Sequence, residues 1–305
     1  MKKQRQFSSE SISCVNDLCF PVHFVKNPER TNKPHNRLVI GLLQDNDTGK
    51  NYRKVLNYCS ESYGLVPNSS IFPQIEDILN ANNISYEVTY KHVDNVEFYV
   101  TYLITDKRFI WTVPGTTDTI QMQIKIQHSY NGAKVFKIYV GWFRAICFNG
   151  IVAPVKELQK FNLMIVVKHA TKIHESFEQF NTMLLNIQNN TDEIVEAIGG
   201  KFSKLAQTVV TPENFENMLT QTLEAAGIKQ ITNSKYCTLE DIKARTMLEA
   251  NHPTLGYKGT VNQWLVYNAI NQYINDDTLN VTNPETREAN DAKVLDYLLS
   301  LHEVE

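Results

Sequence analysis

The sequence predicts an α+β protein: an antiparallel β-sheet with a β-hairpin, flanked by one N-terminal helix and followed by a mainly helical C-terminal part. Residues 86–140 hold several segments rich in β-branched and aromatic residues, separated by short polar breaks, as is typical of strands. Beyond Pro154 the segments are longer and carry helix start and stop signals. Strands and helices thus occupy different parts of the chain, which is the pattern of the α+β class.

The chain before the sheet is expected to hold an irregular arm and one helix. Residues 1–36 are polar, contain prolines and lack sustained periodicity, so we expect an arm with one short strand at residues 20–25. The helix is expected to begin near Ser69 or Ser70, which are suitable N-cap residues, with Pro73 in its first turn.

The strongest strand signal is a strict alternation of apolar and polar residues over residues 120–127. One set is expected to face the core and the other the solvent. Asn131–Gly132 follow, a pair that favours a type I′ turn, so we expect a tight hairpin with a returning strand over residues 133–140. For residues 142–150, a further strand and a short helix ended by Gly150 both fit the pattern.

The C-terminal part is expected to be largely helical over residues 156–190, 191–207, 211–227, 260–276 and 290–305. Thr211 and Pro212 form a good helix start signal. The pair Gly199–Gly200 is expected to break a helix. The stretch "GGKFS" there is not a phosphate-binding loop, because the upstream glycine and the preceding strand are missing.

Length and charge divide the chain into three regions. With 305 residues the chain is long enough to bury a substantial core. The formal net charge of −3 conceals an asymmetry: residues 1–172 hold 21 Lys and Arg against 14 Asp and Glu, whereas residues 173–305 hold 9 against 19. We expect an irregular arm at residues 1–36, a basic α+β core at residues 37–172 and an acidic helical region at residues 173–305.

Several classes of protein and site are disfavoured. No apolar segment is long enough for a signal peptide or a membrane span, so we expect a cytosolic protein without a membrane partner. The five cysteines include no Cys-x-x-Cys pair, so neither a disulfide framework nor a zinc site is indicated. His169 and His174 would lie about 140° apart on a helix, which is unfavourable for sharing a metal. We recognise no catalytic motif, and we expect a protein that is not an enzyme and uses no cofactor or metal.

Cations and aromatic residues are interleaved in the sheet region. Residues 86–172 contain eleven Lys and Arg against six Asp and Glu, among many Tyr, Phe and Trp. Cations that contact phosphates, next to aromatic rings that stack on bases, are typical of proteins that bind single-stranded nucleic acid. The alternative is that the aromatic residues form the core and the lysines only the solvated side of a sheet.

Two short motifs resemble those of a known family. After a glycine turn and a strand, the chain shows an Arg-x-x-Cys-x-Asn-Gly signature at Arg144, Cys147, Asn149 and Gly150. Near its end it shows a Trp-x-x-x-Asn-Ala segment at Trp264, Asn268 and Ala269. From about residue 63 to residue 299 the chain thereby resembles the phage and plasmid proteins that carry the domain of unknown function DUF932. Phe148 is a departure, because a small polar residue is commoner there.

The resemblance implies a role in DNA replication or recombination, because members of the family occur on phages and plasmids. The order of helix, antiparallel strands with a hairpin, then helix is also similar to the core of Rad52-type single-strand annealing proteins, which form rings and bind DNA along a basic groove. This second similarity is an analogy at the level of the fold.

We therefore expect a phage- or plasmid-encoded protein of the bacterial cytoplasm that binds and anneals single-stranded DNA. It is expected to form a homo-oligomer, a ring or filament, and to recruit host or phage replication proteins through its acidic C-terminal region. The alternative is a non-catalytic interaction or virion-associated protein whose basic sheet binds an acidic protein. The residues expected to contact DNA are Lys125, Lys134, Lys137, Arg144, Lys156, Lys160, Lys168, Tyr130, Trp142 and Phe143.

Overall fold

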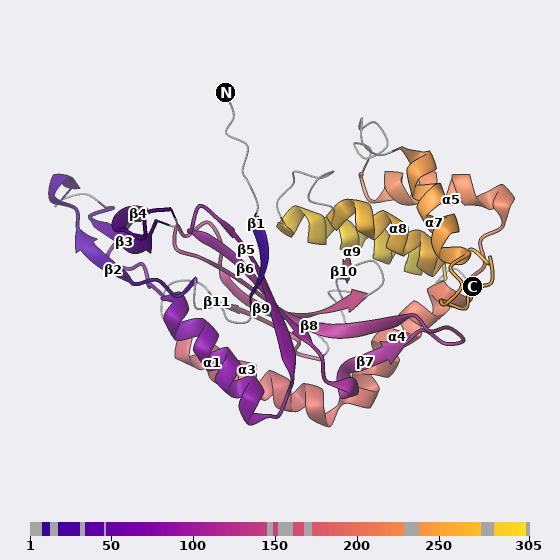
Figure 1. Ribbon diagram of the computed structural model, residues 1–305, viewed down its shortest axis with the longest axis horizontal. Coiled ribbons are helices and arrows are strands. Elements are labelled where there is room, and N and C mark those ends of the chain that lie inside the picture. Colours follow the sequence, from indigo (N-terminus) through magenta and orange to yellow (C-terminus); the bar gives the residue numbers. More distant parts are fainter. Residues whose placement is uncertain are drawn as a thin grey trace. The chain divides into compact units, whose positions relative to one another are not determined.

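The computed structural model describes residues 8–12, 18–30, 34–45, 47–144, 149–151, 161–167, 173–228, 238–275 and 284–302. The predicted α+β class is confirmed, since every strand pair found among these residues is antiparallel and most helices follow the sheets (Figure 1). The strands are β1 (Ser8–Ile12), β2 (Val22–Lys26), β3 (Arg37–Gln44), β4 (Asn51–Cys59), β5 (Tyr86–Val93), β6 (Glu97–Ile104), β7 (Ile110–Thr112), β8 (Thr119–Ser129), β9 (Phe136–Arg144), β10 (Asn149–Ile151) and β11 (Met164–Val167). The α-helices are α1 (Asn68–Ala81), α3 (Ile173–Asn189), α4 (Thr191–Gln207), α5 (Pro212–Ala225), α7 (Leu239–Ala250), α8 (Gln263–Asn275) and α9 (Pro284–Ser300).

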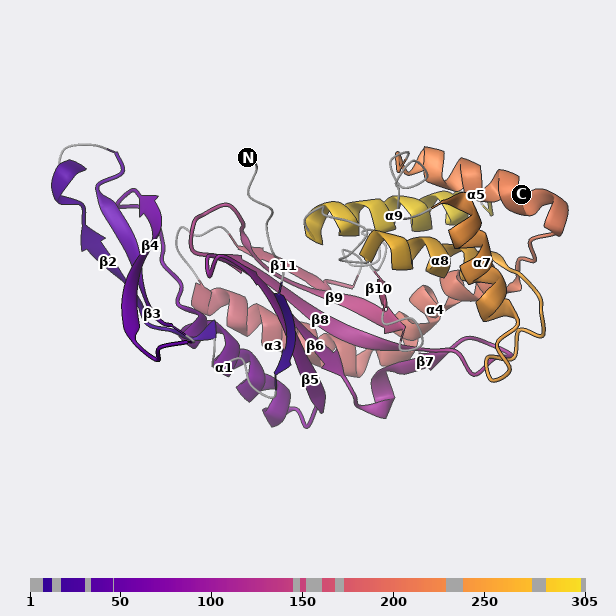
Figure 2. The same cartoon turned by 45° about the horizontal axis from the view of Figure 1, so that its top comes forward.

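The described strands form two sheets. The large sheet has eight strands in the order β1-β5-β6-β8-β9-β10, with β7 paired to β8 and β11 paired to β9. Figure 2 shows β5, β6 and β8 side by side in it. The small sheet has the order β2-β3-β4. Strand β2 confirms the short strand expected near residues 20–25, whereas β3 and β4 were not predicted.

The chain folds into two compact units made of discontinuous segments. The first unit comprises Met1–Asp106, Gln123–Tyr139 and Met164–Asn186. The second unit comprises Lys107–Met122, Val140–Leu163 and Ile187–Glu305. Strands β8 and β9 each pass from one unit into the other, so the units do not follow the boundaries expected at residues 36 and 172.

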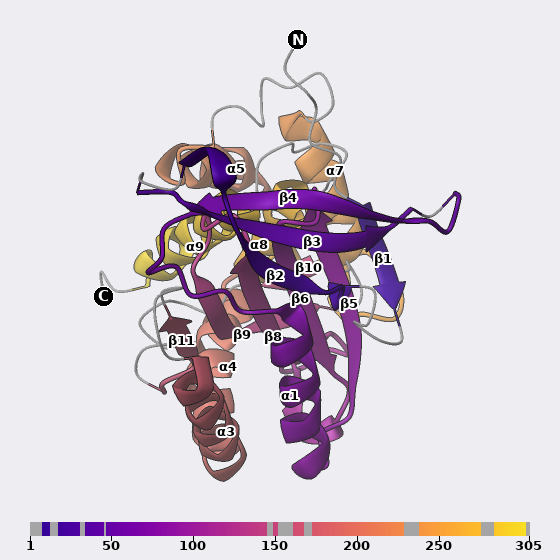
Figure 3. The same cartoon turned by 90° about the vertical axis from the view of Figure 1, so that its left-hand side faces the viewer.

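Two helices cover one face of the large sheet in the first unit. Helices α1 and α3 lie side by side on this face, which we call the inner face (Figure 3). The Tyr102 hydroxyl of β6 donates to Glu76 of α1 at 3.4 Å, and the Phe136 ring of β9 contacts Phe177 of α3. Ile124, paired with Tyr102 across β6 and β8, is fully buried on the same face. Because side chains alternate along a strand, the polar residues of β8 lie on the opposite, outer face.

Helix α1 begins earlier than expected. Its N-cap is Pro67, and the Asn68 N–H donates to the buried hydroxyl of Tyr130 at 2.8 Å. This bond pairs one of the N–H groups that the first turn of a helix leaves without a partner inside the helix. Ser69 and Ser70 lie within the helix and do not cap it. Pro73 consequently lies inside the helix, where its missing N–H removes a single bond within the helix.

The connection between β8 and β9 is longer than the expected two-residue turn. It spans residues 130–135, and Gly132 takes a positive φ of 71° whereas Asn131 does not. The Asn131 side chain instead accepts from the Ala133 N–H at 2.9 Å, which forms a local turn. The Ser129 hydroxyl accepts from the Lys134 N–H at 3.0 Å and closes the loop. The predicted hairpin is thus confirmed, but the predicted type I′ turn is wrong.

Residues after the hairpin contain more strand than expected. Strand β9 continues to Arg144 and pairs with β10, so the described residues of 142–150 are strand and the short helix is wrong. Strand β11 interrupts the segment expected to be helical from residue 156 onward, and it pairs with residues Phe136–Tyr139 of β9. Its sequence, Met-Ile-Val-Val, favours a strand because β-branched residues lose less freedom there.

Helix α8 is the central element of the second unit. It contacts α4, α7, α9 and β10, and every residue from Gln263 to Asn271 is buried. The Tyr267 hydroxyl donates to Asp291 of α9 at 3.1 Å, and Asn271 donates to the other carboxylate oxygen at 2.6 Å. Burial and the adjacent Asp291 carboxylate raise the pKa of Tyr267 well above its ordinary value. Helix α7, which was not predicted, packs against α8.

Helix α4 runs through Gly199–Gly200, so the expected helix break is wrong. A Cβ atom at Gly199 would lie 2.7 Å from Nε1 of Trp111, whereas a Cβ at Gly200 would have nothing within 4 Å. Gly199 therefore permits the indole of β7 to lie directly on the helix backbone. This packing compensates for the low helix propensity of glycine.

Candidate nucleic-acid interface

Arg144, expected to contact phosphate, lies in a buried cluster of polar side chains in the second unit. Its Nε donates to Oδ1 of Asp118 at 2.9 Å and its Nη2 donates to Oδ2 at 2.6 Å, which is a bidentate pair. Its Nη1 donates to Glu249 of α7 at 2.5 Å, and the second Glu249 oxygen accepts from Arg245 at 3.1 Å. The side chains of Arg144 and Asp118 are 0% exposed.

Asp118 joins this cluster to two aromatic residues. Its Oδ2 also accepts from the Tyr257 hydroxyl at 2.7 Å and from Nε1 of Trp264 at 3.0 Å. Burial and the neighbouring carboxylate raise the pKa of Tyr257 well above its ordinary value, so it stays a neutral donor. The Arg144 guanidinium lies 5.8 Å from the centre of the Trp264 ring.

The two sequence motifs therefore meet at one carboxylate. Arg144 begins the first motif and Trp264 the second, and both donate to Asp118. Asn268 of the second motif donates to the Trp264 carbonyl at 2.7 Å, within α8. The motifs hold β9, α7 and α8 together in the second unit. Arg144 is thus a structural residue, and its expected contact with phosphate is corrected because the guanidinium is wholly enclosed.

The aromatic residues expected to stack on bases are mostly buried. Tyr130 is 0% exposed, and its hydroxyl accepts the Asn68 N–H while its ring contacts Phe98 in the first unit. Trp142 is 2% exposed. Both residues belong to the core and are removed from the candidate interface. Phe143, half-buried, lies on β9 opposite Gly150 of β10 in the second unit.

Two of the expected lysines share the outer face of the large sheet in the first unit. Lys125 is opposite Thr101 of β6, and its neighbours Ile124 and Ile126 are buried. Lys137 follows Phe136, whose ring points to α3, so its side chain lies on the outer face. Lys125 and Lys137 are both half-buried, which leaves part of each side chain accessible.

Tyrosines accompany these lysines on the outer face. The Lys137 ammonium lies 4.0 Å from the centre of the Tyr139 ring, a cation–π contact, but Tyr139 is only 5% exposed and supports the lysine rather than a base. Tyr99 of β6 is half-buried and pairs with Gln127. The outer face is less exposed to solvent than expected, because Gln123 and Gln127 of β8 are buried.

The outer face carries a glutamate near each end of its β5–β6 hairpin and a lysine between them. Glu97 and the exposed Glu87 stand near opposite ends of the hairpin formed by β5 and β6. Lys125 lies between them along the strands, opposite Thr101. An anionic chain would therefore be favoured across the centre of this face.

The remaining expected lysines lie elsewhere. Lys134 is half-buried in the connection between β8 and β9, where its N–H donates to the Ser129 hydroxyl. Lys156, Lys160 and Lys168 lie outside the described residues. The interface built from the described residues is consequently smaller than the expected one, with Lys125 and Lys137 at its centre.

Sequence reasoning missed the aromatic and basic residues of the small sheet. Tyr52 and Tyr58 of β4 are 44% and 56% exposed, and Arg53 between them is exposed. The signal was present in the sequence, because "NYRKVLNYC" interleaves cations with tyrosines in a β-rich segment.

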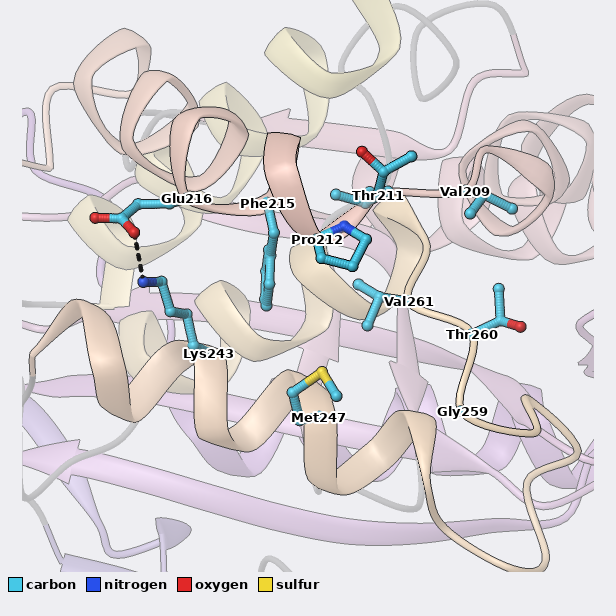
Figure 4. Close-up of a pocket in the computed structure, with 11 residues that line it drawn as sticks. Val209, Thr211, Pro212, Phe215, Glu216, Lys243, Met247, Gly259, Thr260 and Val261 are labelled. Carbon is cyan, nitrogen blue, oxygen red and sulfur yellow. Dashed lines mark hydrogen bonds and ion pairs between the residues drawn. The ribbon is translucent and has the colours of Figure 1, made fainter.

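The second unit has a cavity of about 550 Å³ between α5, α7 and two connecting segments (Figure 4). Its lining is largely apolar and includes Phe215 and Met247. Lys243 and Glu216 form an ion pair of 2.8 Å at one end. Since the cation is already paired with a carboxylate, this cavity suits an apolar group better than a phosphate.

Two other features, a metal site and a membrane-spanning helix, are absent from the described part of the chain. No three His, Cys, Asp or Glu side chains there are grouped in a way that would hold a metal ion. None of the helices described is long and apolar enough to cross a membrane.

Comparison with known proteins gave one family. The model of DUF932, a domain of unknown function, matches residues 55–297. Neither the curated proteins nor the solved structures gave a match. The matched residues include all of the large sheet from β5 to β11 and both motifs that meet at Asp118. The chain belongs to the DUF932 family.

Proposed function

We propose that this protein binds single-stranded DNA on the outer face of its large sheet and anneals complementary strands without nucleotide hydrolysis. The observation that supports the proposal is the arrangement of Lys125 and Lys137 on one sheet face, beside the half-buried Tyr99. Helices α1 and α3 cover the inner face of this sheet in the first unit, which leaves these lysines on the other side.

The chemistry of this face suits a flexible anionic chain. Each ammonium that neutralises a phosphate releases a counterion, which favours binding most strongly at low salt. Tyrosine rings in a sheet present flat surfaces for bases, and each stacked base contributes about 1–3 kcal/mol. A single strand can bring both its bases and its phosphates onto a sheet, whereas the bases of a duplex are already stacked on one another.

The biological setting is part of the proposal. The motif resemblance to phage and plasmid proteins supports a phage- or plasmid-encoded protein that acts in DNA replication or recombination in the bacterial cytoplasm. Annealing requires two strands to be held together, so we propose a homo-oligomer. The acidic helices of the C-terminal part, with 19 Asp and Glu against 9 Lys and Arg after residue 172, would bind partner replication proteins rather than DNA.

The proposal is tested by removing the two lysines of the outer face. The double variant K125A/K137A should bind labelled oligo-dT more weakly, and the slope of log affinity against log salt should fall by about 1.4 for two phosphate contacts on a single strand. The matched control is K204A/K293A, which removes two exposed lysines from α4 and α9. If K125A/K137A, K204A/K293A and the wild type, all folded, bound oligo-dT with equal affinity, the outer face would not be the binding site.

An acidic protein is the alternative partner, because the same lysines would bind carboxylates. Carboxylates on a folded protein offer no bases to stack on tyrosine. Substitution of Tyr99 by Ala, with the lysines intact, should therefore weaken oligonucleotide binding if DNA is the ligand. A protein whose oligo-dT affinity is undetectable at low salt would favour the acidic protein instead.

A further inference from the structure

The small sheet has one covered face and one open face. Pairing places Val39, Gly41 and Leu43 of β3 on the same face as Cys59 and Tyr52 of β4. Val39, Leu43 and Cys59 are buried, and a Cβ at Gly41 would lie 2.9 Å from Leu56 and 3.0 Å from Phe20. This covered face is therefore closely packed on the first unit.

The opposite face is apolar and open. It consists of His23, Val25, Leu38, Ile40, Leu42, Arg53, Val55 and Tyr58, and we call this set the open face. Ile40 in its middle is buried, Leu38 and Leu42 are half-buried, and the other five are exposed. Val25, Val55 and Tyr58 are 39%, 43% and 56% exposed. Large apolar side chains exposed together on one small sheet indicate a contact surface.

The charge of the small sheet indicates what contacts it. Its strands, whose residues are all described, carry Lys26, Arg37, Arg53 and Lys54 but no Asp or Glu. Arg53 lies on the open face and is exposed. A second copy of the chain packed face to face would add another Arg53, and its three strands would supply no carboxylate. An anionic partner with flat apolar groups complements this surface better.

The small sheet is held firmly enough to present a defined surface. Lys54 donates to the Asp94 carbonyl at 2.7 Å, which ties β4 to the turn between β5 and β6. The Arg37 guanidinium lies 5.2 Å from the centre of the Phe24 ring. The covered face thus uses two of the four cations for structure, and Arg53 is left on the other side.

We propose that the open face is a second contact surface for single-stranded DNA, where a base stacks on Tyr58 and Arg53 binds a phosphate. This inference rests on the proposed function and extends it from the large sheet to the small one. The faces of a base are flat and apolar, so they can pack on the valines and the tyrosine of this surface. The phosphates of the DNA backbone supply the negative charge that complements Arg53.

The test compares variants of opposite faces of the same sheet. R53A/Y58A removes one cation and one exposed tyrosine from the open face, while K26A/Y52A also removes one exposed cation and one exposed tyrosine, here from the covered side. Binding is measured with labelled oligo-dT of about 30 nucleotides, long enough to occupy both sheets at 4–16 nucleotides each. We expect R53A/Y58A to bind about tenfold or more weakly and K26A/Y52A to bind within about twofold of the wild type.

The outcomes separate this inference from the proposed function. Wild-type affinity of R53A/Y58A, together with weak binding by K125A/K137A, would overturn the second surface and leave the first. Equal losses in R53A/Y58A and K26A/Y52A would also overturn it, because the effect would not belong to one face. No binding by the wild type would overturn both. Recovery of affinity in R53K/Y58F would support a stacked base and a neutralised phosphate.

Discussion

Among single residues, the Asp118 carboxylate explains what Arg144 and Trp264 do in this chain. Asp118 accepts from both Arg144 and Trp264 and from Tyr257, with no exposure to water. Two charged groups lose their hydration when they are buried, so the cluster is favourable only while every donor and acceptor is paired. Lysine cannot replace Arg144 here, since one ammonium cannot match the planar fork that binds two carboxylates.

Substitution of Arg144 by Lys keeps the charge but loses hydrogen bonds to Asp118 and Glu249, so it should lower the free energy of unfolding by about 1.5–3 kcal/mol for each bond lost. Chemical denaturation followed by circular dichroism measures this change. Lys243, whose ion pair with Glu216 lies at the surface, provides the control, and K243A should unfold close to the wild-type midpoint. If R144K unfolded like the wild type but lost affinity for DNA, the structural role given to Arg144 would be wrong.

Adjacent glycines in α4 should respond in opposite ways to the same substitution. Gly199→Ala would place a methyl group 2.7 Å from the Trp111 indole, so we expect a loss of about 1–3 kcal/mol in the free energy of unfolding. Gly200→Ala meets no atom within 4 Å and should add about 0.5–1 kcal/mol, because alanine favours the helix. Urea unfolding of both variants decides the matter, and equal stabilisation by both would show that Trp111 does not pack on Gly199.

At the scale of the element, α7 shows how a helix end is stabilised. The Thr238 hydroxyl accepts from the Asp241 N–H at 3.2 Å, and the Asp241 carboxylate accepts from the Thr238 N–H at 2.7 Å. These two bonds form a capping box. The Thr211 side chain, which precedes α5 as the sequence predicted, accepts no hydrogen bond from a backbone N–H of its helix.

Thr238→Ala should consequently lower the free energy of unfolding by about 1 kcal/mol, and Thr211→Ala by less. Hydrogen bonds from Thr238 lower the pKa of Asp241. A carboxyl whose pKa is lowered in the folded state stabilises it above the ordinary pKa, and this contribution is lost as the pH falls through the lower value. Urea unfolding across the acid range should show a weaker pH dependence for T238A. Identical pH profiles would contradict the capping role of Asp241.

The sequence predicted those elements that depend on local patterns. The alternation in β8 identified both the strand and its inner face, because a period of two depends only on neighbouring residues. The burial of Arg144 depends on Asp118 and Glu249, which are 26 and 105 residues away, and no local pattern reveals such partners. Similarly, Gly199–Gly200 is a local helix-breaking signal that contact with a remote tryptophan overrides.

The candidate interface was partly predictable for the same reason. Alternation placed Lys125 on the face opposite the core, whereas composition alone suggested Tyr130 and Trp142, which the fold buries. Aromatic residues in strands are as suitable for a core as for a binding surface, and only the position of α1 and α3 decides which face is covered. The small sheet escaped prediction although Leu38–Leu43 forms an apolar run typical of a strand.

At the scale of the whole molecule, tyrosines couple folding to pH in the alkaline range. Burial raises the pKa of Tyr63, Tyr102, Tyr130, Tyr257 and Tyr267 above the ordinary value. The ordinary value is about 10, so the unfolded chain loses these protons above that pH while the folded chain keeps them. The stabilisation is therefore full below about pH 10 and declines as the pH rises further.

This behaviour can be followed by the ultraviolet absorbance of tyrosinate. A fraction of the tyrosines should ionise only when the circular dichroism signal of the helices is lost, since these hydroxyls are buried in both units. Complete ionisation near pH 10 with an intact helix signal would contradict the burial of these side chains.

The central claim is that a basic and aromatic sheet surface binds single-stranded DNA. The most direct test titrates the wild-type protein against labelled oligo-dT at low and at physiological salt, with a duplex of equal length measured alongside. We expect tight binding to the single strand, weaker binding to the duplex and a marked loss of affinity as salt rises. Absence of binding at low salt, where phosphate contacts are strongest, would contradict it.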